Sequence, residues 1–363
     1  MKWLLVAMFI ILISTTSPAQ QGASRGDEVS VDANGIVRIP AMTIPLSPYM
    51  SDDAKWAFIK RTTTAPVAES EWETAPEEVR QAYVQAEARR RLKRAAELYP
   101  VNISDREFRG VMTQIIEPSQ GIGARNQHRI LIDLHGGSYR HVSDKRMELI
   151  DALPIASRGR IRVVSVDYRT SPEYKFPAAV EDVIKVYREL LKTYRAENVG
   201  IYGGSTGAAL TAVAVAWFQR EKLPRPGAIG LFCEGAIKDD QIEGDSYYIA
   251  PPLMGDEVRG VDSAYPINAY MADTDGHDPY VAPVVSLDVL SRFPPTLLIS
   301  GTRDIGLSSV LYTHARLTKA AAEAELHVWD GMWHGFFSDV DLPESTEAYD
   351  VIDGFFDRHL GFR

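Results

Sequence analysis

The sequence contains a single cysteine, Cys233, and this scarcity limits what can stabilise the chain. With one thiol no disulfide can form within the chain, so stability has to come from a hydrophobic core. The chain has 363 residues, 45% of them hydrophobic, which is enough for one large domain or two ordinary ones.

Long hydrophobic runs and an excess of positive charge are also missing. The apolar run from Trp3 to Ile13 is well short of the roughly 20 residues that a helix needs to span a bilayer. Lys and Arg total 39 against 49 Asp and Glu, which gives a formal net charge of −10. This acidic balance argues against nucleic acid or an anionic membrane as the partner.

The first 19 residues predict a secretory signal peptide. Lys2 precedes the apolar run, and the small residues Ser17 and Ala19 stand three and one positions before a cut between Ala19 and Gln20. We therefore expect an exported protein, periplasmic or secreted, without a stable membrane anchor once the signal peptide is removed.

Composition and hydrophobic periodicity change along the rest of the chain. Residues 20–48 are punctuated by Gly, Ser and Pro and predict a loose arm, whereas residues 49–100 predict helices. Further on, short β-branched runs alternate with helical patterns, which predicts an α/β fold with a mostly parallel sheet flanked by helices. Residues 238–285 interrupt this alternation and predict an insertion over the sheet. The α/β core then comprises residues 101–237 and 286–363.

The periodicity places individual elements within this plan. Seven apolar runs predict strands at 110–117, 128–134, 160–168, 198–203, 227–233, 294–301 and 325–330. Helices are predicted in the core at 144–156, 177–194, 206–221, 308–322 and 344–360, and before it at 51–61 and 74–99. The helix at 74–99 begins with a capping box formed by Thr74 and Glu77.

A serine in a glycine-rich stretch is the first candidate for chemistry. The run Gly-Gly-Ser-Thr-Gly around Ser205 matches the G-x-S-x-G pattern of nucleophilic serines, but so does "GASRG" at 22–26. Ser205 alone follows a strand-length apolar run and precedes a helix-length one, the setting that exposes a nucleophile on a tight turn. An ordinary glycine-rich turn is the alternative.

A serine hydroxyl also needs a base and an orienting carboxylate. His334 is the best candidate among eight histidines, because it follows the predicted strand at 325–330 and lies between glycines. Asp304 lies just beyond another buried strand and ahead of a helix, where a helix N-cap is the alternative. The chain order Ser, Asp, His is that of α/β hydrolases.

Backbone donors for an oxyanion are expected after another strand. The predicted strand ends at Leu134, and the His-Gly-Gly turn that follows leaves backbone N–H groups unobstructed. A plain Gly-Gly turn is the alternative.

From about Arg129 to Leu360 the chain resembles the bacterial hormone-sensitive-lipase-like carboxylesterases of the α/β-hydrolase superfamily. The resemblance rests on HGGS, DYRTSPEYKFPAAVEDV, GGSTG, DPYVAPVVSLDVLSRFPPTLLISGTRD and HGF, in that order. It implies an α/β-hydrolase fold of about eight strands, with a helical cap formed by residues 49–100 and 238–285. It also implies hydrolysis of short to medium acyl esters or lactones through an acyl-enzyme, without a metal or an organic cofactor.

The resemblance assigns a role to each matching residue. Ser205 would be the nucleophile, His334 the general base and then acid, and Asp304 its orienting partner. The residues implied for the oxyanion hole are Gly136, Gly137, Ser138 and Thr206, with His135 supporting the loop.

Three residues depart from the family pattern. Ser138 stands in place of a glycine and Thr206 in place of a frequent alanine, and both bear on substrate shape. Glu234 follows a strand where Ser-Pro is more usual, so the resemblance does not predict the geometry at the entry to the cap.

A non-catalytic ligand-binding protein of the same fold is the rival function, although the presence of His334 argues against it. Either a monomer or a homodimer is compatible with the sequence, because an exposed last strand would permit edge-to-edge pairing.

Overall fold

The computed structural model describes residues 28–63, 77–140, 149–238, 244–255 and 269–361. Residue contacts divide the chain into two units, Met1–Pro45 and Leu46–Arg363. The described part of the first unit contains a short antiparallel pair, β1 (Ser30–Val31) and β2 (Val37–Arg38). The predicted signal peptide, residues 1–19, lies outside the described residues. Within the part of the chain that is described, no helix has the length and apolar character needed to cross a membrane.

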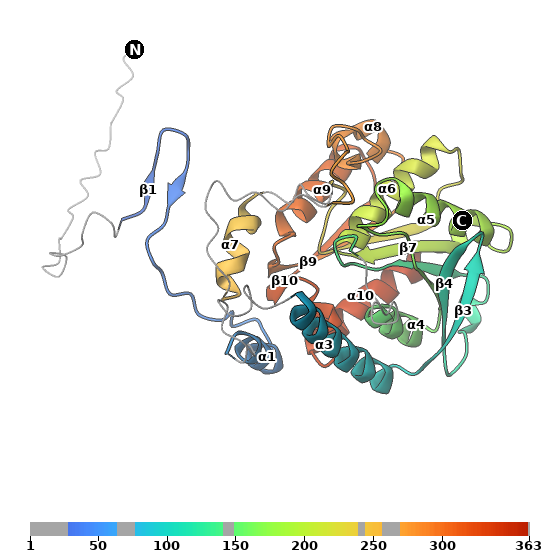
Figure 1. The fold of residues 1–363 in the computed structure, drawn as a ribbon, viewed down its shortest axis with the longest axis horizontal. Coiled ribbons are helices and arrows are strands. Elements are labelled where there is room, and N and C mark those ends of the chain that lie inside the picture. The colour runs from blue at the N-terminus through green and yellow to red at the C-terminus, as the bar shows by residue number, and fades with distance from the viewer. Residues whose placement is uncertain (1–27, 64–76, 141–148, 239–243, 256–268, 362–363) are drawn as a thin grey trace, which may run out of the picture. The chain divides into compact units, whose positions relative to one another are not determined.

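An eight-stranded sheet forms the centre of the second unit (Figure 1). Its strands are β3 (Val101–Phe108), β4 (Val111–Pro118), β5 (Ile130–Leu134), β6 (Arg162–Val166), β7 (Val199–Gly204), β8 (Ala228–Phe232), β9 (Thr296–Arg303) and β10 (Ala324–Trp333). Their spatial order is β10-β9-β8-β7-β5-β6-β4-β3. The strands from β10 to β6 are parallel, and β4 and β3 add an antiparallel edge. The carboxyl ends of six strands therefore share one edge of the sheet.

Helices cover both faces of this sheet (Figure 1). They are α4 (Ala152–Gly159), α5 (Ala178–Leu190), α6 (Thr206–Arg220), α8 (Leu287–Leu290), α9 (Leu307–Lys319) and α10 (Pro343–His359). Buried side chains of α5, α6, α8 and α9 share one hydrophobic cluster with Ile132 and Ile201. Those of α4 and α10 share the other cluster with the neighbouring strand residues Leu131 and Tyr202. Successive strand side chains point to opposite faces, and both faces are buried, which explains the nearly continuous apolar runs in the sequence.

Three further helices pack around this core. They are α1 (Asp52–Thr63), α3 (Glu77–Leu98) and α7 (Asp245–Leu253). Helix α1 contacts α10, α3 contacts α4, and α7 contacts β9 and α9. Ser51 Oγ accepts from the backbone N–H of Ala54 at 3.0 Å, and the buried Glu344 accepts from the backbone N–H of Ser51 at 2.6 Å. This contact ties the start of α1 to the start of α10. The predicted capping box begins at Thr74, outside the described residues.

The seven predicted strands are confirmed as β4 to β10, but the edge strand β3 has no counterpart among the predictions. Most β3 side chains are exposed, so the apolar run by which strands were recognised is absent, and pairing with β4 defines the strand instead. The predicted helix 144–156 is wrong in its bounds: α4 begins at Ala152, and residues 141–148 lie outside the described chain. Pro154 lies in the first turn of α4, the part of a helix that tolerates the missing N–H, whereas in the predicted helix it would have been interior.

A buried carboxyl group on β5 gives the fold a dependence on pH. Asp133 is 3% exposed, and burial raises its pKa to about 7, although Ser165 Oγ donates to it at 2.6 Å. The folded protein therefore keeps a proton that the unfolded chain releases above its ordinary pKa of 3.8. The contribution of Asp133 to stability is fully present below that ordinary value and is lost as the pH rises toward 7.

We predict that Asp133→Asn flattens the pH dependence of stability between pH 5 and 7. One proton held by the folded state changes the free energy of unfolding by about 1.4 kcal/mol per pH unit. Urea unfolding at several pH values measures this slope. Asp288→Asn, which changes an exposed carboxyl, is the matched control and should leave the slope unaltered. An identical slope in Asp133→Asn and the unmodified protein would contradict the prediction.

Candidate active site

Ser205 lies on a sharp turn between β7 and α6. Its backbone has φ 53° and ψ −131°, a left-handed conformation that is strained for a residue with a side chain. The surrounding backbone is too close for larger neighbours: a Cβ at Gly207 would lie 1.8 Å from the carbonyl oxygen of Leu134. The backbone N–H of Ser205 donates to the carbonyl of Phe232 at 2.7 Å. The turn is thus packed against β5 and β8, and Ser205 itself is half-buried.

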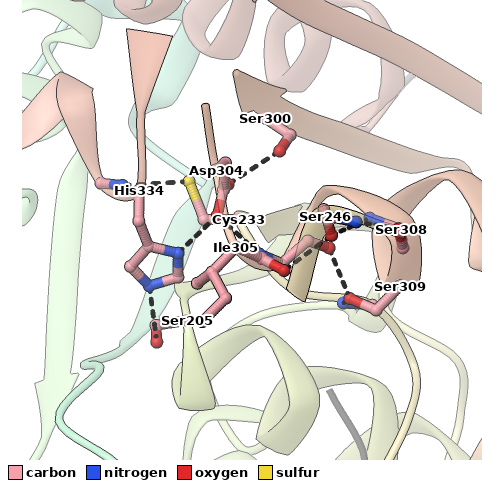
Figure 2. Close-up of polar contacts among 12 residues, drawn as sticks. Ser205, Cys233, Ser246, Ser300, Asp304, Ile305, Ser308, Ser309 and His334 are labelled. Carbon is pink, nitrogen blue, oxygen red and sulfur yellow. Dashed lines mark hydrogen bonds and ion pairs between the residues drawn. The ribbon is translucent and has the colours of Figure 1, made fainter. Parts of the chain in front are cut away.

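The structure brings His334 and Asp304 to this serine (Figure 2). His334 follows β10, and its Nε2 lies 3.0 Å from Ser205 Oγ. Asp304 follows β9, and its Oδ1 lies 2.7 Å from His334 Nδ1. With Nδ1–H donating to the carboxylate, Nε2 accepts from the serine hydroxyl. The arrangement can take a proton from Ser205 and stabilise the imidazolium that results.

The surroundings of Asp304 keep its carboxylate ionised. Asp304 is fully buried, and burial alone opposes ionisation. The adjacent imidazole of His334 and the donors Gly306 N–H and Ser300 Oγ, at 2.8 and 2.7 Å, nevertheless hold the pKa of Asp304 below 3.8. A charged carboxylate at this position orients the imidazole and fixes its tautomer.

The glycine turn after β5 lies against Ser205. A Cβ added to Gly136 would lie 3.0 Å from the carbonyl oxygen of Gly204 and 3.3 Å from Ser205 Cβ. Gly137 has φ 106° and Ser138 has φ 53°, so the loop bends sharply at these residues. The loop that is predicted to hold the oxyanion donors therefore lies directly beside Ser205.

Two other predicted residues border this loop. His135 Nδ1–H donates to the carbonyl of Gly136 at 2.7 Å, and its ring stacks on Tyr168 with centroids 4.1 Å apart. Tyr168 Oη donates to the carbonyl of His135 at 2.7 Å. Thr206, the first residue of α6, is 1% exposed. The His135 ring thus bonds to the loop itself, and the hydrogen bonds that join Ser205, His334 and Asp304 do not include it.

Three residues of the site were missed from the sequence. Ser300 lies inside β9, and Gly306 follows the turn after it, and both donate to Asp304. Cys233 has no predicted role beyond excluding an internal disulfide, yet its Sγ accepts from the backbone N–H of Gly335 at 3.2 Å. No sequence motif marks these residues, although Cys233 and Gly306 come soon after the ends of β8 and β9. Glu234, which departs from the family pattern, is completely buried next to Cys233.

Comparison with known proteins identifies the family. Residues 131–338 match the family model for the α/β-hydrolase fold. The chain belongs to the α/β-hydrolase family. An acetyl-hydrolase of Streptomyces hygroscopicus is 32% identical over 243 residues, which cover 64% of this α/β hydrolase and 76% of the relative. An esterase of Acinetobacter venetianus is 26% identical over 228 residues, which cover 61% of this chain and 72% of the relative.

Solved structures agree with this identification. The crystal structure of an esterase matches with a TM-score of 0.73 and 29% identity, covering 89% of this α/β hydrolase and 98% of that chain. An esterase from the bacterial hormone-sensitive lipase family matches with a TM-score of 0.68 and 23% identity, covering 88% and 100% of the two chains. The predicted resemblance is thus confirmed in the fold, and the prediction of a carboxylic ester hydrolase is confirmed by the esterase relatives.

We predict that Asp304→Asn lowers kcat by roughly 10⁴, because the amide cannot hold the imidazole in the productive tautomer. Ser300→Ala removes one of the donors to the same carboxylate and should lower kcat by about tenfold or less. Circular dichroism and hydrolysis of p-nitrophenyl acetate check folding and kcat. Equal losses in the two variants would contradict the separate roles of the carboxylate and its donor.

Proposed function

We propose that this α/β hydrolase cleaves short to medium acyl esters or lactones through a covalent acyl-enzyme on Ser205. The observation that carries the proposal is the unbroken set of contacts from Ser205 Oγ through His334 to Asp304. Ser205, His334 and Asp304 are at least 30 positions apart in the chain, yet they meet within hydrogen-bonding distance. The contacts run from serine to histidine to aspartate, as a nucleophile, its base and an orienting acid require.

Acylation would begin as Ser205 Oγ attacks the ester carbonyl and its proton passes to His334 Nε2. Asp304 stabilises the imidazolium, and backbone N–H groups of Gly137, Ser138 and Thr206 stabilise the oxyanion. When the tetrahedral intermediate collapses, the C–O bond to the leaving group breaks and the alcohol takes the proton from His334. Water then attacks the acyl group with His334 again as base, and the carboxylic acid and Ser205 are released.

Two features support short to medium acyl groups. Ser138, which replaces a family glycine, places a half-buried side chain in the oxyanion loop and would narrow the adjacent space. The Streptomyces relative is named an acetyl-hydrolase, which favours small acyl groups here as well. We therefore expect p-nitrophenyl acetate and butyrate to be turned over faster than a long-chain ester such as the palmitate.

We predict that Ser205→Ala loses hydrolysis of p-nitrophenyl acetate and butyrate by roughly 10³- to 10⁶-fold while the protein stays folded. Stopped-flow assays of the unmodified enzyme should show a burst of p-nitrophenol, provided that deacylation is slower than acylation. Mass spectrometry would then detect acylated Ser205. Undiminished turnover in Ser205→Ala would refute the proposed nucleophile.

The rival function, a ligand-binding protein without catalysis, makes a different prediction. The proximity of His334 to Ser205 favours an activated serine, so a fluorophosphonate probe should label Ser205 in the unmodified protein and fail to label His334→Ala. Failure to label the unmodified protein would favour the binding protein.

We also propose that the enzyme is exported, on the strength of the amino-terminal pattern from Lys2 to Ala19. Expression of the full chain in a Gram-negative host should place the enzyme in the periplasm or the medium, with Gln20 as its first residue by amino-terminal sequencing. An intact chain that begins at Met1 and stays in the cytoplasm would contradict export.

A further inference from the structure

The end of β8 touches all three loops that carry Ser205, Asp304 and His334. Toward the nucleophile, the carbonyl of Phe232 accepts from the backbone N–H of Ser205 at 2.7 Å. The next residue, Cys233, is 1% exposed and continues the contacts toward the other two loops. In Figure 2 its sulfur lies beside Asp304, with the loop of His334 next to it.

Toward the base, Cys233 binds the peptide group that follows His334. Its Sγ accepts from the backbone N–H of Gly335 at 3.2 Å, so the peptide plane between His334 and Gly335 has a fixed direction. The orientation of that plane limits where the imidazole can lie. The Sγ of Cys233, a carboxylate oxygen of Asp304 and a ring nitrogen of His334 all lie within 4.8 Å of one another. The sulfur therefore also packs against the carboxylate–imidazole pair.

Toward the acid, the backbone of Cys233 limits the loop that holds Asp304. A Cβ added to Gly306 would lie 2.0 Å from the carbonyl oxygen of Cys233, and Gly306 N–H donates to Asp304 Oδ1 at 2.8 Å. The backbone N–H of Cys233 donates to the carbonyl of Ile299 on β9 at 2.7 Å. The residue after β8 is therefore fixed on both the β9 side and the β10 side.

Cys233 adopts a backbone conformation that a side chain disfavours. Its φ is 62°, in the left-handed region where glycine is the residue without strain. A side chain at this position costs stability, so its presence calls for a compensating contribution. The acceptor that Sγ provides to the His334 loop is such a contribution, because the partly buried N–H of Gly335 would otherwise lose a hydrogen bond.

We propose that Cys233 is a positioning residue, whose thiol holds the loop of His334 so that the imidazole stays between Asp304 and Ser205. The proposal rests on the proposed function, since it concerns the base of that reaction. It requires the sulfur as a hydrogen-bond acceptor and makes no use of its nucleophilicity.

Three substitutions separate the acceptor from the backbone conformation. Cys233→Ser keeps an acceptor and should retain kcat within about threefold, whereas Cys233→Ala and Cys233→Gly remove it and should lower kcat by about 10- to 100-fold. KM should change by less than about twofold, because the substitutions alter the backbone contact beside His334 and leave the oxyanion loop and Ser205 unchanged. Cys233→Gly also relieves the left-handed strain, so its melting temperature should equal or exceed that of Cys233→Ala.

A purely structural role predicts a different order. Activity would then follow thermal stability, and Cys233→Gly would be more active than Cys233→Ala. Ala321→Gly is the matched backbone control, because Ala321 is exposed and has φ 56°. It should raise the melting temperature without changing kcat.

A spectroscopic signature reports on the base directly. The downfield proton resonance of His334 Nδ1–H should persist in Cys233→Ser and shift or broaden in the Ala and Gly variants. Three results would each overturn the proposal. The first is a wild-type kcat in Cys233→Ala and Cys233→Gly, and the second is a higher kcat in Cys233→Gly than in Cys233→Ala. The third is a loss of kcat in Cys233→Ser as large as that in Cys233→Ala. These outcomes leave the proposed function intact, whereas full turnover in Ser205→Ala would refute that function itself.

Discussion

The close approach of α6 to β5 is the constraint on which the active site depends. Gly207 lies so near the carbonyl of Leu134 that any side chain would collide with it. This contact lets the helix begin directly after Ser205 and confines the serine to a strained left-handed conformation. The same approach brings the glycine loop after β5 against Ser205, so the proposed nucleophile and the proposed oxyanion donors share one packing contact.

Parallel pairing explains why residues far apart in the chain meet at this point. Five strands, β5, β7, β8, β9 and β10, run in the same direction with their carboxyl ends at one edge of the sheet. The first residues beyond these strands are His135, Ser205, Cys233, Asp304 and His334. Each is a site residue or, for Cys233, a neighbour that contacts the loops of Asp304 and His334. The register of the parallel strands thus places the proposed catalytic groups side by side.

Two buried aspartates show how local donors decide the charge of a carboxyl group. Asp133, inside β5, accepts from Ser165, and burial prevails, so its pKa rises to about 7. Asp304 is buried even more completely, yet an adjacent imidazole and two donors reverse the direction of the shift. The first keeps its proton up to about pH 7, at a growing cost in stability as the pH rises, whereas the second stays charged, as a partner of His334 must.

The α/β class, seven of the strands, and the candidates Ser205, Asp304 and His334 could be predicted from the amino-acid sequence, because buried strands and glycine turns leave strong local patterns. The sequence did not determine β3, whose side chains are mostly exposed and which exists by pairing with β4. It placed the start of α4 wrongly and gave no signal for Ser300, Gly306 or Cys233 as neighbours of the base and acid. Those contacts arise from the register of parallel strands, which brings together loops that are far apart in the chain, so they become visible only in the folded structure.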